Sequence, residues 1–221
     1  MKKKAIIFGT TDFAQVASVY LRDDAGYQIE AFTANREYIN EPSMLGIPIV
    51  PFEDLTDTHP AREFDVFCAI GFSKVNANRR AVYNECAKRG YSLPAYVNST
   101  VRRWKETSIG NGSFIFEDNV IQPFVTIGEN CVLWSGNHIG HHSTIGDHVF
   151  IASHIVISGH CTIGDNCFLG VNATLRDGIT VGKDSVIGAG VLLLKDTAES
   201  AVYKGAATEP QARRSDELRK F

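Results

Sequence analysis

The sequence contains no apolar run long enough to cross a membrane. The basic start, Met1 to Lys4, is followed by an apolar run, Ala5 to Phe8, that ends at Gly9 and is too short for the core of a signal peptide. With 22 Lys and Arg against 25 Asp and Glu, the formal net charge of -3 provides no general basic field for nucleic acid. We therefore expect a cytoplasmic protein without a membrane or nucleic-acid partner.

Cysteine is scarce, with five residues, and none of them forms a Cys-x-x-Cys pair. An odd number of cysteines does not suit a disulfide framework, and the missing pairs argue against a structural zinc site. Cys131, Cys161 and Cys167 recur at one position of the repeat described next, which is otherwise small or apolar. The sequence therefore predicts free, buried thiols.

A large aliphatic residue occupies every sixth position over more than a third of the chain. The column is Ile109, Ile115, Ile121, Ile127, Leu133, Ile139, Ile145, Ile151, Ile157, Ile163, Leu169, Leu175, Val181, Ile187 and Leu193. A helix repeats its apolar face every 3.6 residues and a strand every 2, so neither explains this period. A hexapeptide repeat is typical of a β-helix, in which three short strands make a coil of about eighteen residues. The column should fill its core.

A second inward column should follow four residues after the aliphatic one, because its members are mostly small or apolar. They are Ser113, Val125, Cys131, Ser143, Val149, Ile155, Cys161, Cys167, Ala173, Ile179, Ser185 and Val191. We assign residues 98–194 to the β-helix, residues 1–97 to a separate domain, and residues 195–221 to a C-terminal tail that includes a short charged helix over 212–221.

The first domain alternates predicted strands and helices, which is typical of a small, Rossmann-like α/β domain with a parallel sheet. Strands are predicted over 5–8, 28–33, 47–50, 64–70 and 92–97, and helices over 13–21 and 75–89. In such sheets, ligands bind at the carboxyl ends of the strands. The candidate substrate-binding residues at these ends are Gly9, Thr10, Asp12, Thr33 and Lys74.

The turn Gly9-Thr10-Thr11 precedes the first predicted helix, where backbone N–H groups can hold a phosphate. Asp12 is expected to cap this helix. The turn has one glycine and is not the GxGxxG dinucleotide fingerprint. A plain strand-to-helix turn without a ligand is the alternative.

The β-helix register places His141 outside both inward columns and beside Gly159 of the next coil, about 4.8 Å away. A histidine next to a glycine leaves a notch that a thioester can enter. A neutral imidazole suits the role of general base for an amine or hydroxyl nucleophile. The alternative is that His141 is only a hydrogen-bonded surface residue.

Histidine recurs at one further repeat position, as His142, His148, His154 and His160. Consecutive repeats point to different faces, so only His142 and His160 should stack. Such a pair could join histidines of a neighbouring subunit in a zinc site. Packing in a subunit interface is the interpretation we favour, and we expect no metal.

An N-terminal α/β domain before a hexapeptide β-helix resembles the nucleotide-sugar acetyltransferases. The motifs that carry the resemblance are Gly140-His141-His142-Ser143-Thr144-Ile145-Gly146 and Gly164-Asp165-Asn166-Cys167-Phe168-Leu169-Gly170-Val171-Asn172-Ala173. The family includes UDP-4-amino-sugar and GDP-perosamine N-acetyltransferases, and the sialic acid O-acetyltransferases are similar. The resemblance implies a left-handed β-helix, a homotrimer, and acetyl-CoA bound between subunits.

The resemblance also implies roles for individual residues. His141 matches the general base, and His142 stands where an acidic residue usually orients it. Coil amides matching Gly159, Val171 and Ala189 would hold the acetyl oxygen and the pantetheine. Lys195 and Lys204 are candidates for the CoA phosphates by their charge. The α/β domain would hold the nucleotide.

We therefore expect an acetyl-CoA-dependent N-acetyltransferase that acts on a nucleotide-linked amino sugar, such as a 4-amino-4,6-dideoxy sugar. The chemical alternative is a sugar O-acetyltransferase, which would use the same base on a hydroxyl. Two further classes remain open: a non-catalytic β-helix scaffold or nucleotide-binding module, and a zinc-dependent lyase on the same β-helix. CoA binding and metal content would distinguish them.

Overall fold

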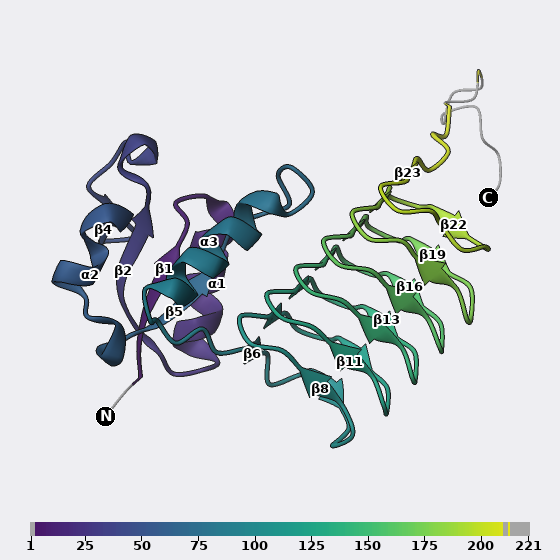
Figure 1. The fold of residues 1–221 in the computed structure, drawn as a ribbon, viewed down its shortest axis with the longest axis horizontal. Coiled ribbons are helices and arrows are strands. Elements are labelled where there is room, and N and C mark those ends of the chain that lie inside the picture. The colour runs from purple at the N-terminus through teal and green to yellow at the C-terminus, as the bar shows by residue number, and fades with distance from the viewer. Residues whose placement is uncertain (1–2, 210–211, 213–221) are drawn as a thin grey trace.

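The computed structural model describes residues 3–209 and 212, and places an α/β domain beside a parallel β-helix (Figure 1). Within these residues, no helix is both long and apolar enough to span a bilayer. The helix expected over 212–221 lies outside the described residues, except for residue 212.

The α/β domain is built on a five-stranded sheet of order β3-β4-β2-β1-β5. All neighbours are parallel except β3 and β4, which pair antiparallel at the edge. Its elements are β1 (Lys4–Phe8), α1 (Asp12–Asp23), β2 (Gln28–Ala34), β3 (Ser43–Met44), β4 (Ile47–Pro51), α2 (Leu55–Thr58), β5 (Asp65–Cys68) and α3 (Ala77–Lys88), with single 3₁₀ turns at Arg36–Tyr38, Phe52–Asp54 and Ala61–Glu63. The predicted strands and helices of residues 5–89 are thus present, with β5 shorter than expected.

The start of α1 differs from the sequence prediction. Thr11, not Asp12, is the N-cap residue, and it makes no side-chain capping bond. Asp12 is the first helical residue, where its carboxylate still faces the positive end of the helix dipole. One face of the helix is buried against the sheet through Phe13, Ala17 and Leu21.

The β-helix has three parallel sheets, which form the faces of a triangular prism. The docked face contains β6 (Tyr96–Val97), β9 (Phe114–Ile115), β12 (Val132–Leu133), β15 (Phe150–Ile151), β18 (Phe168–Leu169), β21 (Val186–Ile187) and β23 (Val202–Tyr203). The apolar face contains β7 (Arg102–Arg103), β10 (Val120–Ile121), β13 (His138–Ile139), β16 (Val156–Ile157), β19 (Thr174–Leu175) and β22 (Leu192–Leu193). The threonine face contains β8 (Ser108–Ile109), β11 (Thr126–Ile127), β14 (Thr144–Ile145), β17 (Thr162–Ile163) and β20 (Thr180–Val181).

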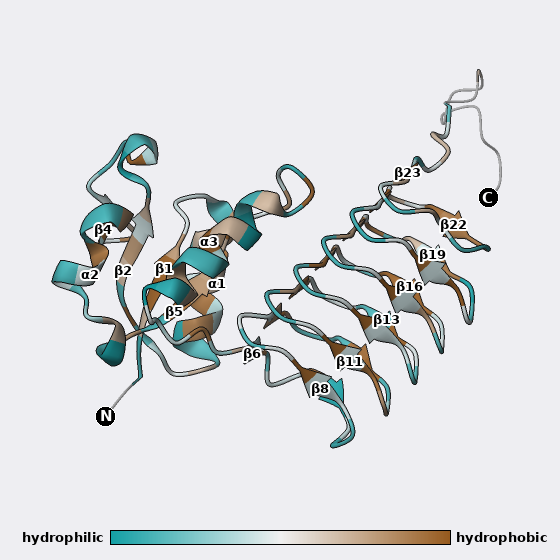
Figure 2. Ribbon diagram, in the orientation of Figure 1, coloured by the Kyte–Doolittle hydropathy of each residue, from teal (hydrophilic) through white to brown (hydrophobic). Residues whose placement is uncertain are grey.

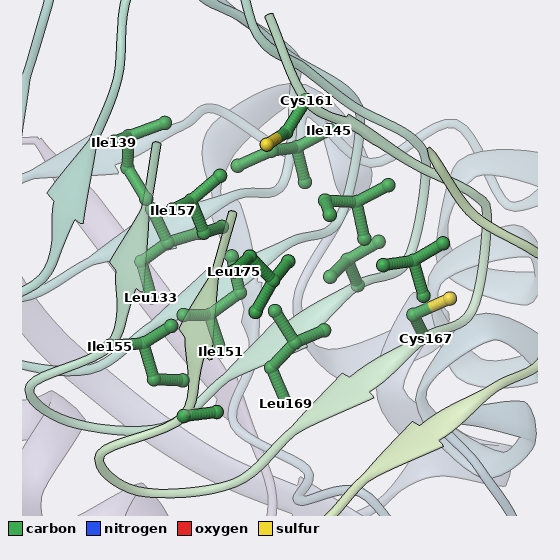
Figure 3. Close-up of a cluster of buried hydrophobic side chains, with 14 of the residues drawn as sticks. Leu133, Ile139, Ile145, Ile151, Ile155, Ile157, Cys161, Cys167, Leu169 and Leu175 are labelled. Atoms are coloured by element: carbon green, nitrogen blue, oxygen red, sulfur yellow. The ribbon is translucent and has the colours of Figure 1, made fainter. Parts of the chain in front are cut away.

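Both predicted inward columns are confirmed. The aliphatic column is buried from Ile115 to Leu193, with Ile109 half-buried at the open end of the prism. The second column is buried as well, including Cys131, Cys161 and Cys167, and all five cysteines are free and buried. Figure 3 shows members of both columns meeting inside the coils, among them Ile139, Ile157, Cys161 and Cys167.

The strand predicted over 92–97 belongs to the β-helix instead of the α/β sheet. Tyr96 and Val97 form β6, which pairs with β9 as the first strand of the docked face. Only a single bridge, between Ser92 and Asp65, joins this segment to β5. A short apolar run cannot reveal which of two parallel sheets it joins, because both require the same residues.

The α/β domain packs on the docked face through aromatic side chains. The outward positions there are Phe114, Val132, Phe150 and Phe168, in strands paired eighteen residues apart. Phe13 of α1 packs edge-on against Phe114 at 6.2 Å between ring centroids. Figure 2 shows the apolar residues gathered in the strands of both domains and hydrophilic residues in many of the turns. The two domains therefore share one hydrophobic cluster.

Buried polar groups fix the same interface. Arg79 of α3 is fully buried and donates hydrogen bonds to the carbonyl oxygens of Asn130 at 3.2 Å and His148 at 2.7 Å. Asn76, just before α3, donates to the carbonyl of Asn166 at 2.8 Å. Burial lowers the pKa of Arg79 to about 10, which leaves the guanidinium charged at neutral pH. The loop before α3 is thereby held against the β-helix.

Candidate active site

The residues with the clearest chemistry lie at one corner of the prism, which we call the histidine corner. It joins the apolar face to the threonine face and contains residues 140–143, 158–161 and 176–179. His141 and His142 are both exposed there, as the register predicted. The backbone N–H of His141 donates to the side-chain oxygen of Gln122 at 2.9 Å. His142 has a φ of 58°, which turns the chain sharply at the corner.

Gly159 lies beside His141, also as predicted. A Cβ at this position would be 3.0 Å from Nε2 of His141 and 2.8 Å from its Cε1. The same point is 3.0 Å from Oδ1 of Asp177, the equivalent residue of the following coil. Any side chain larger than hydrogen would therefore displace the imidazole. Glycine here creates a notch with an imidazole on one side and a carboxylate on the other.

The two groups flanking the notch do not neutralise each other. Among the ion pairs of the described residues, none within 4.0 Å joins His141 to Asp177. Within residues 3–209, no protein group accepts a hydrogen bond from the backbone N–H of Gly159. The notch thus combines a proton acceptor, a carboxylate and an unused amide donor, which are the groups needed to bind an amine and stabilise an oxyanion.

His142 lies directly beside His141. Its Nδ1 lies 3.1 Å from Nδ1 of His141, and the two rings are nearly perpendicular. When His141 donates its Nδ1–H to His142, Nε2 of His141 carries the lone pair on the side of Gly159. A neutral imidazole can therefore fix the tautomer of His141, without the charge that a carboxylate would supply.

His160 completes this group of imidazoles. Its ring stacks on His142, with centroids 4.9 Å apart and planes at 15°, and lies 5.0 Å from the ring of His141. The stacking of His142 and His160 was expected from the eighteen-residue spacing. The participation of His141 was missed, because the spacing does not show that neighbouring side chains of one turn converge.

The other two histidines of the repeat, His148 and His154, lie away from the histidine corner. His148 is half-buried against the α/β domain, its ring 5.9 Å from that of Tyr83, and burial lowers the pKa of its imidazole. Its side chain also contacts Nδ2 of Asn130 at 2.9 Å. His154 is exposed at a different corner, beside Gly136. These positions favour structural roles for His148 and a solvent-exposed one for His154.

The candidate cofactor residues occupy two corners. Lys195 follows Asp177 by one coil length at the end of the histidine corner and is exposed. Val171 and Ala189 lie at the valine corner, residues 170–173 and 188–191, which joins the docked face to the apolar face. The backbone of Lys204 lies close to Gly188 of that corner. A single chain therefore does not bring Gly159 together with Val171 and Ala189.

Two clefts lie at the carboxyl ends of the α/β strands. Thr10 lines one of 210 Å³ together with Tyr38, and Lys74 lines one of 330 Å³ with Asn35 and Tyr38. Tyr38 contributes to both and is 63% exposed. It was missed because a residue in a single 3₁₀ turn carries no periodic signal. Gly9, at φ 140°, is required where β5 approaches, since a Cβ would lie 2.6 Å from the carbonyl of Ala69.

Two of the predicted substrate residues are corrected by the structure. Thr33 is fully buried, and its hydroxyl donates to the carbonyl of Val50 at 2.7 Å, so it ties β2 to β4 and cannot reach a ligand. Asp12 is exposed in the first turn of α1 and lines neither of the two clefts. Strand-end position alone does not tell whether a side chain faces the sheet interior or the cleft.

The clefts and the histidine corner lie on opposite sides of the β-helix. The α/β domain packs on the docked face, while the histidine corner joins the other two faces. In a three-sided prism, the corner between two faces is opposite the third. The α/β domain of a chain is thus separated from His141 of the same chain by the width of the coil.

Comparison with known proteins agrees with this architecture. The model for the bacterial transferase hexapeptide (six repeats) matches residues 106–141, 125–159 and 142–176, and the model for the hexapeptide repeat of succinyl-transferase matches residues 161–195. No curated protein sequence matches the chain.

Several solved structures have the same fold over nearly the whole chain. The acetyltransferase domain of PglB from Neisseria gonorrhoeae, in complex with acetyl coenzyme A, is 22% identical with a TM-score of 0.84, and the match covers 96% of this chain and 100% of that one. PerB from Caulobacter crescentus, in complex with CoA and GDP-perosamine, is 23% identical with a TM-score of 0.82, over 93% and 95%. WeeI from Acinetobacter baumannii is 20% identical with a TM-score of 0.81, over 92% and 97%.

These matches confirm the predicted fold class, a small, mostly parallel α/β domain followed by a left-handed parallel β-helix. The hexapeptide models cover the coils that carry His141, Gly159 and Asp177. Residues 106–195 therefore match the hexapeptide repeats of bacterial transferases, and the chain has the fold of the PglB and perosamine acetyltransferases.

Proposed function

We propose that the protein is an acetyl-CoA-dependent N-acetyltransferase whose substrate is a nucleotide-linked amino sugar, such as a 4-amino-4,6-dideoxy sugar. The observation that carries the proposal is the notch above Gly159, where Nε2 of His141 and the carboxylate of Asp177 lie on either side. The backbone N–H of Gly159 has no acceptor among the described residues, which supports its use as a donor to the oxyanion. The likeness to structures that hold acetyl-CoA, or CoA with GDP-perosamine, supports the choice of substrates.

In the proposed reaction, the amine nitrogen attacks the carbonyl carbon of the thioester and a tetrahedral intermediate forms. His141 takes a proton from that nitrogen at Nε2, while the N–H of Gly159 donates a hydrogen bond to the oxyanion. Collapse of the intermediate breaks the carbon–sulfur bond. The CoA thiolate leaves and takes a proton from the His141 imidazolium, which restores the neutral base.

Asp177 favours an amine over a hydroxyl as the nucleophile. Its carboxylate oxygen and Nε2 of His141 both lie 3.0 Å from the same point above Gly159. An amino sugar arrives partly as its ammonium, which a carboxylate attracts, whereas a neutral sugar hydroxyl gains much less from it. This arrangement is why we rank N-acetylation ahead of the O-acetylation expected of a sialic-acid-type enzyme.

A homotrimer would complete the site that a single chain leaves divided. The histidine corner and the valine corner flank the apolar face, whose outward positions alternate between apolar and polar residues: Arg102, Val120, His138, Val156, Thr174 and Leu192. Val156 and Leu192 are 41% and 62% exposed. The threonine face presents Thr126, Thr144 and Thr162 instead. Packing of another copy against the apolar face would bring Gly159 of one chain toward Val171 of the next, and Lys195 and Lys204 toward the same cofactor.

The same assembly would carry the clefts of one chain, at Thr10 and Lys74, toward His141 of a neighbour. Because each chain holds its own clefts on the far side of the prism, the sugar nucleotide would be bound by one subunit and acetylated at another. We therefore propose Thr10, Lys74 and Tyr38 as the nucleotide-binding side of the site. Gly9 was also predicted to bind the substrate, but it is buried, lines neither cleft and donates its N–H to the carbonyl of Thr33 at 2.8 Å, so it only shapes the turn.

The test is a screen of UDP-, GDP- and dTDP-linked amino sugars with acetyl-CoA, followed by thiol release. Products are then treated with hydroxylamine, which cleaves acetyl esters and leaves acetamides intact. Activity with an amide product supports the proposal, whereas an ester product assigns O-acetylation. If none of the sugars tested leads to thiol release, the proposed substrate is wrong. If the protein is a stable monomer by light scattering and is fully active, the proposed trimer is wrong.

A further inference from the structure

We propose that His141, His142 and His160 form a binding site for a divalent transition-metal ion of the Zn²⁺ class, and that the bound ion blocks acyl transfer. The three residues lie at the histidine corner of a single chain and are all exposed. One potential ligand nitrogen from each lies within 4.8 Å of the other two. The blocking part of this inference rests on the function proposed above, and the binding part does not.

The distances suit a tetrahedral ion. Zinc binds imidazole nitrogen at about 2.0–2.1 Å, so two ligand nitrogens on one tetrahedral ion lie about 3.3 Å apart. The Nδ1 atoms of His141 and His142 are 3.1 Å apart. The nitrogen of His160 has to move by at most about 1.5 Å, which is the outer limit of 4.8 Å less the tetrahedral spacing of about 3.3 Å, and rotation of an exposed ring supplies that movement.

The backbone beneath the three rings is held in place. The N–H of His160 donates to the carbonyl oxygen of His141 at 2.8 Å, which joins two successive coils at this corner. His142 and His160 both have positive φ, at 58° and 57°, so their side chains leave the chain in the same direction and stack. The cost of ordering ligands on binding is therefore lower than for three histidines on separate loops.

The surroundings leave room for an ion and its remaining ligand. Phe124 packs on His142 at 4.7 Å between ring centroids and closes one end of the cluster. At the other end, the residue after His160 in the column is Gly178, and a Cβ there would meet nothing within 4 Å. All three donors are imidazoles, which suit Zn²⁺, Ni²⁺ or Cu²⁺ and not the oxygen-seeking Mg²⁺ or Ca²⁺.

An ion on this cluster would disable His141 whichever nitrogen it used. Coordination through Nε2 occupies the lone pair that faces Gly159. Coordination through Nδ1 of a neutral ring places the one ring proton on Nε2, which then cannot accept another. Acyl transfer would therefore be inhibited by free metal and restored by a chelator. The metal is an inhibitor in this proposal and supplies no step of the reaction.

The test uses untagged, chelator-treated full-length protein and Zn²⁺ alone, with binding followed by calorimetry and with Co²⁺ as a spectroscopic probe of a tetrahedral site. His160→Asn removes one donor. His154→Asn is the matched control, because His154 has the same repeat position and the same positive φ but lies at the valine corner, and among the described residues it belongs to no such histidine group. Loss of a direct ligand should weaken binding at least as much as the roughly 10–100-fold that loss of an outer partner costs.

The wild type and His154→Asn are expected to bind one ion per chain with equal affinity, and His160→Asn at least about ten-fold more weakly. No binding by the wild type, or equal binding by His160→Asn, overturns the site. Inhibition is measured as the ratio of rates with and without Zn²⁺ for each variant. Binding without inhibition would keep the metal site and refute His141 as the base. If no sugar is acetylated, the calorimetry still decides the site.

Discussion

Replacing Gly159 with alanine should remove most of the activity while leaving the fold intact. The added Cβ would lie 2.8 Å from Cε1 of His141, and ordinary contact begins at 3.4 Å, so the imidazole has to swing away. The atoms that the added Cβ would meet belong to the side chains of His141 and Asp177. Gly159 does not have a positive φ, so alanine can adopt its backbone conformation and the backbone need not move. The free energy of unfolding should change by less than about 1 kcal/mol.

The catalytic cost follows from the displacement. A misplacement of about 1 Å at a reacting group can cost about 10²-fold in rate, and the ring has to move by roughly half of that or more. We expect kcat/KM of Gly159→Ala to fall by about ten-fold to a hundred-fold. Steady-state thiol release gives the rate, and thermal unfolding followed by circular dichroism gives the stability.

A matched control lies at the same corner. A Cβ on Gly140 would come within 2.5 Å of the backbone nitrogen of Gly159, so two coils would be forced apart. Gly140→Ala should therefore destabilise the protein by about 1–3 kcal/mol, as overpacking does. If Gly159→Ala is fully active, or loses activity only because it unfolds like Gly140→Ala, the notch is not the reaction site.

Four further predictions follow from the same geometry. His141→Ala should lower kcat by about 10²–10⁴-fold, and His142→Asn by less, because His142 orients the base without facing Gly159; a dead His142 variant beside an active His141 variant would reverse the two roles. Asp177→Asn should raise KM for the amino sugar in a pH-dependent way and leave KM for acetyl-CoA unchanged, and an unchanged sugar KM would exclude contact with the amine. Lys74→Ala should raise KM for the sugar nucleotide, with Lys88→Ala, on the same domain but outside the clefts, as control. Finally, burial opposes ionisation of Glu117, but hydrogen bonds from Ser135 and Tyr20 outweigh it and lower the carboxyl pKa. The unfolded chain then binds more protons, so the free energy of unfolding should fall as pH drops below the ordinary pKa of 4.5. Melting curves of Tyr20→Phe should show a weaker fall with pH than those of the wild type. An equal fall in both proteins would show that the Tyr20 hydrogen bond does not contribute.

The outward positions of the β-helix carry a second sequence signal, which is independent of the inward six-residue repeat. Phe114, Phe150 and Phe168 come just before inward residues at eighteen-residue spacing, with Val132 between them, whereas the threonine face has Thr at the same place. An outward column of aromatic residues is expected only where something covers it. This also means that deletion of the α/β domain would expose the docked face, so substitutions within the clefts are better tests of substrate binding.

The sequence by itself determined the β-helix, its register and the position of His141 beside Gly159. A coil stacks each residue on the one eighteen positions later, so one-dimensional spacing translates directly into contact. The same regularity placed the buried cysteines and the His142–His160 stack. It could not place Asp177 and His141 on either side of one notch, because that depends on how the side chains bend over Gly159.

Only the tertiary structure decided what lies between elements without a shared period. Thr33 follows the pattern of a strand-end ligand, yet neighbouring β4 covers it and takes its hydroxyl. Tyr38 became part of both clefts through a turn with no repeating signal. The docking of the α/β domain opposite the histidine corner depends on long-range contacts of Arg79 and the outward aromatic residues. Local pattern fixes which residues are buried within an element, whereas the partner that buries them is chosen by the packing of the whole chain.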